Sequence, residues 1–126
     1  MPEIALPRQF DQIARVCDLV EAYAETHGWS ASDVVRVGLV VGEAVGNAVE
    51  HGSGPKVYVR YGILEKHLHL RISDHGEGPS PEMLRGASLP DSPWATEGRG
   101  LYILSQLADE VALADGGLDL VLHRRE

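Results

Sequence analysis

The stretch of sequence that decides the fold is Glu43-Ala44-Val45-Gly46-Asn47-Ala48-Val49-Glu50-His51-Gly52. It places a carboxylate, Glu43, and a carboxamide, Asn47, four residues apart, so a helix would set them one above the other on one face. The residues around them, from 34 to 49, are otherwise almost wholly apolar. Because polar side chains on such a helix need partners, we expect a metal, a phosphate or a substrate hydroxyl against this face.

Two interpretations of this pair follow from its chemistry. Mg²⁺ accepts carboxylate and amide oxygens beside waters and phosphate oxygens, and a carboxylate near a bound nucleotide can take the proton from an attacking hydroxyl. The alternative is a structural pair whose hydrogen bonds cap a neighbouring loop. The pair alone does not decide between them.

The same helix carries Gly38, Gly42 and Gly46 at four-residue spacing, and we expect this smooth ridge to seat the helix against the sheet.

Length and composition restrict the class of protein. A chain of 126 residues can form one hydrophobic core but not two, so we expect a single domain over residues 1–126. The net charge of −8 argues against nucleic acid and anionic membranes as partners, yet it is compatible with ATP or a basic protein. The single cysteine, Cys17, indicates a reducing compartment and is interpreted as a small core residue. Without a signal peptide or membrane-spanning run, we expect a cytoplasmic protein.

The spacing of apolar residues predicts the order of the elements. It indicates a strand at 3–6, helices at 10–23 and from about 30 to 51, strands at 56–64 and 67–73, a helix at 101–107, and a closing hairpin with strands at 110–113 and 118–123. The long proline-rich stretch from 74 to 98 is typical of a lid or binding loop. Early helices followed by hairpins predict an α+β two-layer sandwich, with helices on one face of a mixed, mostly antiparallel sheet.

Two glycine-containing segments follow the helix pair. Asp74-His75-Gly76-Glu77-Gly78 comes at the end of a predicted strand, where an aspartate can accept a hydrogen bond from an exocyclic amine and glycines let the backbone approach a planar ligand. An ordinary glycine-rich turn is the alternative. Gly98-Arg99-Gly100-Leu101 precedes a predicted helix, whose free N–H groups form an anion site to which Arg99 would add a charge.

The order Glu-x-x-x-Asn, Asp-x-Gly-x-Gly and Gly-x-Gly-Leu makes the sequence resemble the Bergerat-fold (GHKL) ATPases, which include gyrase and the histidine kinases. The match is strongest to the small stand-alone anti-sigma-factor serine/threonine kinases, whose second glycine box commonly continues much as residues 98–103 do here. The resemblance covers nearly the whole chain. It implies a histidine-kinase-like ATPase fold that uses ATP and Mg²⁺.

The resemblance also implies a role for each matching residue. Glu43 corresponds to the general base and Asn47 to the Mg²⁺ ligand, and Asp74 corresponds to the residue that reads adenine. The remaining matches shape the nucleotide pocket or hold phosphates, with an ATP lid at about 79–97: Gly76, Gly78, Gly98, Arg99, Gly100 and Leu101. Pro79 stands where this branch often has phenylalanine, and no role is assigned to His75, Glu77 or Trp94.

The implied function is phosphate transfer from ATP to a serine or threonine of a small antagonist protein, in a switch that alternately sequesters a sigma factor or similar regulator. The alternatives are a non-catalytic, ATP-gated protein-binding module and the ATPase half of a sensor histidine kinase, although the chain shows no helical hairpin with a phosphoacceptor histidine. A homodimer is common among such kinases, so a second copy of the chain is among the partners that the resemblance implies.

Overall fold

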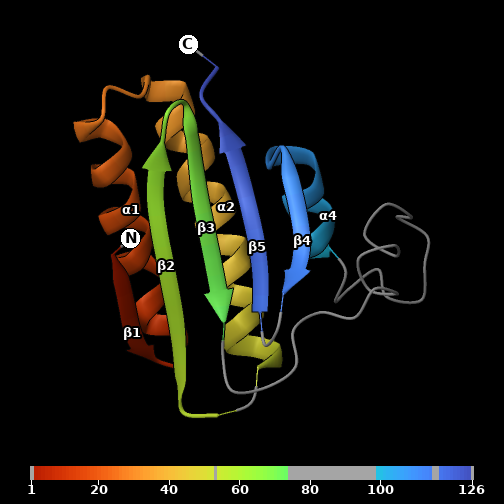
Figure 1. The fold of residues 1–126 in the computed structure, drawn as a ribbon. Helices are drawn as coiled ribbons and strands as arrows, with labels where there is room; N and C mark the ends of the chain where they lie inside the picture. The colour runs from red at the N-terminus through yellow and green to blue at the C-terminus, as the bar shows by residue number, and fades with distance from the viewer. Residues whose placement is uncertain (1, 53, 74–98, 115–116, 126) are drawn as a thin grey trace.

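The computed structural model describes residues 2–52, 54–73, 99–114 and 117–125 (Figure 1). These residues form a five-stranded sheet with helices on one of its faces. The elements are β1 (Glu3–Pro7), the 3₁₀ turn η1 (Phe10–Gln12), α1 (Ile13–Thr26), α2 (Ala31–His51), β2 (Lys56–Leu64), β3 (His67–Ser73), α4 (Arg99–Leu107), β4 (Glu110–Ala114) and β5 (Gly117–His123). The expected two-layer α+β sandwich and the order of its elements are confirmed.

The strand order across the sheet is β1-β2-β3-β5-β4. Each of the four strand pairs among the described residues is antiparallel, so the sheet is antiparallel throughout and the expected parallel component does not occur. Alternating apolar residues of the strands point toward the helices, as in β3, where Leu68, Leu70 and Ile72 are buried. This alternation places one face of the sheet in the core and leaves the other uncovered by the described helices.

Helix α2 lies in the middle of the helical layer, because it packs against α1 on one side and α4 on the other. Ser30 caps its N-terminus by accepting a hydrogen bond from the Asp33 amide at 3.2 Å. Gly28, with φ of +80°, provides the left-handed residue that ends the preceding helix. The buried valines of α2 cover the sheet, and they include Val37, Val40, Val41 and Val45.

The glycine ridge of α2 packs against α1 and not against the sheet, so its predicted partner is wrong while its packing role is correct. A Cβ at Gly42 would lie 3.5 Å from the Cys17 sulfur, and one at Gly46 would lie 3.8 Å from Ile13. At Gly38 the added carbon would collide with the Glu21 carboxylate. Small residues therefore let two helices approach closely, while the valines on other faces of α2 meet the sheet.

Candidate functional site

Three segments that are distant in sequence contribute to the candidate site. The C-terminal half of α2 and the end of β3 lie at the lower end of the molecule in Figure 1, and α4, which packs against α2, begins at its own lower end. Gly117 pairs with Ser73 at the end of β3, and a Cβ on Gly117 would collide with the Ile72 carbonyl oxygen and with Ser73. Glycine at this position therefore allows β5 to run close beside the end of β3.

The apolar face of α2 determines where Glu43 and Asn47 lie. The helix buries Val40, Ala44 and Val45 in the core. Glu43 and Asn47 lie at the edge of this buried face, and both are half-buried. The Asn47 side-chain nitrogen is fully shielded from solvent, yet it has no hydrogen-bond partner among the described residues. Such an unpaired buried amide nitrogen is costly, which makes Asn47 a candidate ligand-binding residue.

Glu43 lies one helical turn before Asn47, as the four-residue spacing predicts. Within the described ranges, no hydrogen bond or ion pair engages its carboxylate. The structural alternative, in which this pair caps a neighbouring loop, would require such bonds. The part of the chain that the structure describes does not supply them.

The third segment of the site is α4, which packs against α2 and begins directly after Gly98. Its first residues are Arg99, Gly100 and Leu101, so the predicted phosphate-binding segment does begin a helix, as the anion-site hypothesis requires. The side chains of residues 99–102 are not described. Asp74, Gly76, Gly78 and Gly98 lie outside the described residues, as do the predicted lid at 79–97, His75, Glu77 and Trp94.

Sequence reasoning missed a buried polar network at the opposite, N-terminal end of α2. Arg36 is 7% exposed and ion-pairs with Asp33 at 3.3 Å and with Asp109 at 3.2 Å. Its guanidinium also donates to the carbonyl oxygens of Leu107 and His123. The only signal in the sequence was a pair of opposite charges three residues apart within an apolar helix.

This network ties α2 to the end of α4 and to the end of β5. Asp33 accepts a hydrogen bond from the Arg125 amide at 3.1 Å, and Asp109 accepts one from the His123 amide at 2.7 Å. Partial burial acts to raise the pKa of the Asp109 carboxyl, but the bonds from His123 and Arg36, with the charges of Arg125 and Arg36, outweigh it and lower that pKa. The network holds α4 in place relative to α2, and with it the helix start that contributes to the site.

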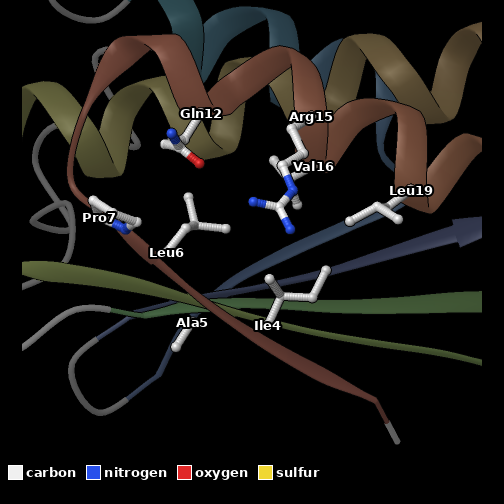
Figure 2. Close-up of a pocket in the computed structure, with 8 residues that line it drawn as sticks. All are labelled: Ile4, Ala5, Leu6, Pro7, Gln12, Arg15, Val16 and Leu19. Atoms are coloured by element: carbon white, nitrogen blue, oxygen red, sulfur yellow. The ribbon is translucent and has the colours of Figure 1, made fainter.

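Two other hollows of the described surface lie apart from the candidate site. A crevice between β1 and α1, lined by residues such as Leu6 and Arg15, has a cavity volume of about 60 Å³ (Figure 2). Ligand pockets usually have volumes of roughly 300–1,000 Å³. A shallow hollow of about 570 Å³ lies over β2, β3 and β5 near Arg71 and Asp119, outside the α2–α4 segments of the candidate site.

Cys17 is partly buried against the core, and burial, followed by the charges of Glu21 and Asp18, raises the pKa of its thiol.

The described part of the chain holds no cluster of three or more His, Cys, Asp or Glu side chains suited to a metal. None of the described helices is both long enough and apolar enough to span a bilayer.

Comparison with known proteins places this architecture among ATPases. Serine-protein kinase RsbW of Bacillus licheniformis is 28% identical over 133 residues, which cover 97% of this chain and 83% of the relative. The RsbW proteins of Bacillus velezensis and Bacillus subtilis strain 168 are 27% and 25% identical, each over 86% of this chain and 74% of their own length. Each relative is thus similar over most of its length.

Among solved structures, full-length ShkA in complex with AMPPNP has the same fold. The TM-score is 0.53 at 20% identity, and the match covers 96% of this chain but only 31% of ShkA. The family profile described as histidine kinase-like ATPase domain matches residues 6–124. Because this match spans nearly the whole chain, the chain belongs to the histidine kinase-like ATPase domain family.

Proposed function

We propose that this protein is an ATP-dependent serine/threonine protein kinase of the anti-sigma-factor type. The observation that carries the proposal is the buried, unpaired Asn47 amide one turn from Glu43, beside a helix start. The similarity to RsbW proteins, which are named serine-protein kinases, supports the reaction class. The family supports the use of ATP, and the small antagonist protein and sigma factor expected from the sequence are the proposed partners.

Asn47 is proposed to bind Mg²⁺ through its carboxamide. The amide can rotate by 180° about its last bond, which exchanges its oxygen and nitrogen and turns the oxygen toward the buried, unpaired position. Mg²⁺ supplies charge that neutralises the nucleotide phosphates during transfer. Asp74 is proposed to read adenine, with Gly76 and Gly78 shaping the pocket. Residues 98–101 are proposed to hold phosphates, with a lid over residues 79–97.

Glu43 is proposed to act as the general base. Its carboxylate would accept the proton of a partner's serine or threonine hydroxyl while the hydroxyl oxygen bonds to the γ-phosphorus. The bond from the γ-phosphorus to the bridging oxygen then breaks, and ADP carries away the electron pair. No described residue pairs with Glu43, so its carboxylate breaks no contact with the described part of the chain when it accepts this proton. A homodimer of this kinase stays a prediction.

The test is transfer of phosphate from γ-labelled ATP to the acceptor protein. The acceptor is first found as the protein that the purified chain labels in an extract of its native cells, and it is then purified. We expect Glu43→Gln to lower the transfer rate by about 10²–10⁴-fold, with Mg-ATP affinity within about threefold of wild type. Glu50→Gln is the control, because Glu50 is an exposed carboxylate on the same helix. A transfer rate of Glu43→Gln equal to that of wild type would refute the general-base role of Glu43. If the wild-type chain binds Mg-ATP but transfers phosphate to no protein, it is a non-catalytic, ATP-gated module.

A further inference from the structure

An apolar stripe on α2 leads along the exposed side of the helix to Glu43. Val35 and Leu39 are 61% and 53% exposed, although both are large apolar residues on a helix that otherwise buries its valines. The spacing 35, 39 and 43 keeps the three residues on one side, turn after turn. We call Val35 and Leu39 the apolar stripe, and we infer that it is the docking surface for the phosphoacceptor protein.

The size of protein interfaces connects the stripe with the reaction. A standard interface covers roughly 800 Å² on each partner, which corresponds to a circle about 16 Å in radius. At a rise of about 1.5 Å per residue, Leu39 and Val35 lie about 6 Å and 12 Å along the helix from Glu43. A protein that brings a hydroxyl to Glu43 therefore also covers Val35 and Leu39. The exception is a protein whose entire interface lies on the C-terminal side of Glu43 along α2.

The surroundings of the stripe define the chemistry of this partner. The Glu21 carboxylate of α1 lies against Gly38, the residue before Leu39, and Glu43 ends the stripe. Two carboxylates thus border the apolar residues, and the whole chain carries a net charge of −8. The complementary partner surface is an apolar patch bordered by lysine or arginine, next to the acceptor serine or threonine.

The stripe is well suited to select a partner because it is not needed to hold the fold. Its side chains point away from the core, which the opposite face of α2 fills with Val37, Val40 and Val41. Exposed apolar residues next to one another on a helix commonly mark binding sites, whereas scattered ones do not. Leu64 is such a scattered residue, 68% exposed at the end of β2, which in Figure 1 is the end of the molecule opposite the site.

The docking surface rests on the proposed kinase function, and its test separates the two. The probe is the acceptor protein that wild-type chain labels from γ-labelled ATP. We expect Val35→Asp and Leu39→Asp each to raise the KM for this acceptor at least tenfold, with the Kd for Mg-ATP unchanged. Leu64→Asp is the matched control and should leave KM within about twofold of wild type. Circular dichroism and thermal unfolding check that each variant is folded.

The outcomes separate the hypotheses. If wild-type chain labels no acceptor, the kinase function fails before the stripe is tested. If wild type labels the acceptor and both stripe variants do so with an unchanged KM, the docking surface is refuted while the kinase function stands. If the variants instead change only the sedimentation of the chain and not the KM, the stripe is a contact between two copies, and the docking surface is likewise refuted.

Discussion

The two halves of α2 treat their polar side chains in opposite ways. In the N-terminal half, Arg36 and Asp33 are buried and bond to one another, to Asp109 and to backbone groups of α4 and β5. Only the Arg36 Nε atom lacks a partner there. In the C-terminal half, Glu43 and Asn47 have no such partners among the described residues, although the Asn47 nitrogen is equally shielded.

The difference separates a structural polar network from a candidate binding site on one helix. Buried charges persist in a fold when hydrogen bonds from several elements satisfy them, and the Arg36 network follows this rule. Asn47 does not follow this rule, because its buried nitrogen has no hydrogen-bond partner among the described residues. A buried group without a partner calls for an explanation, and a ligand that completes its bonding is one. The unequal pairing therefore makes the C-terminal half of α2, rather than its N-terminal half, the candidate binding site.

Removing Arg36 should produce the largest loss of stability. Arg36→Met leaves the Asp33 carboxylate buried without its partner, and the Leu107 and His123 carbonyls lose their donor. We expect the free energy of unfolding in urea to fall by about 3–5 kcal/mol. The matched control is Arg60→Met, because Arg60 pairs with Glu3 at 3.0 Å in an exposed ion pair. Such pairs contribute about 0–1 kcal/mol, so a similar loss in both variants would contradict a special role for the buried network.

Replacing Asp109 should give a smaller, pH-dependent loss. Asp109→Asn removes the charge that Arg36 and Arg125 stabilise, so we expect a loss of about 1–2 kcal/mol at pH 7. Because the folded state lowers the pKa of Asp109, the wild-type advantage is present above the unfolded pKa of about 3.9 and disappears as pH falls through the folded pKa. Urea unfolding at pH 7, 4 and 3 should show the two proteins converging. A difference that stays constant with pH would contradict this origin.

The smallest expected effect is a gain in stability at the glycine ridge. Gly42→Ala would place its Cβ 3.5 Å from the Cys17 sulfur, an ordinary contact, and alanine favours helix. We expect a stabilisation of about 0.5–1 kcal/mol by urea unfolding. Gly38→Ala is the matched variant, since its Cβ would displace the Glu21 carboxylate and so gain less. If Gly42→Ala destabilised the protein more than Gly38→Ala, the described packing of α1 on α2 would be wrong.

The sequence predicts this fold well because its elements follow simple periods. Alternating apolar residues in 56–64 and 67–73 predict two strands of a hairpin, and β2 and β3 confirm both. The predicted helix from about 30 to 51 corresponds to α2, which Ser30 caps, and Gly28 ends α1. These signals are local, since the spacing of apolar residues and the capping side chains act within a few turns of the chain.

Long-range partners were beyond the reach of these patterns. The glycine ridge predicts close packing but does not tell a helix from a sheet as its partner, and α1 proved to be the partner. Arg36 meets Asp109 and the His123 carbonyl across more than seventy residues of sequence, so no local spacing reveals their network. At the site, Glu43 and Asn47 share one side of α2 as predicted, whereas the roles of Asp74 and the glycines remain predictions.

The central claim is that Asn47 is unpaired because it awaits Mg-ATP, and Asn47→Leu tests it most directly. The variant replaces a half-buried side chain, whose amide nitrogen is shielded and unpaired, by an apolar group of similar size. We expect the free energy of unfolding without ligand to be unchanged or to rise by up to about 1 kcal/mol, while calorimetry shows Mg-ATP affinity at least tenfold weaker. A ligand-free protein destabilised by more than about 2 kcal/mol, with unchanged Mg-ATP affinity, would show that Asn47 caps a neighbouring loop and would contradict the claim.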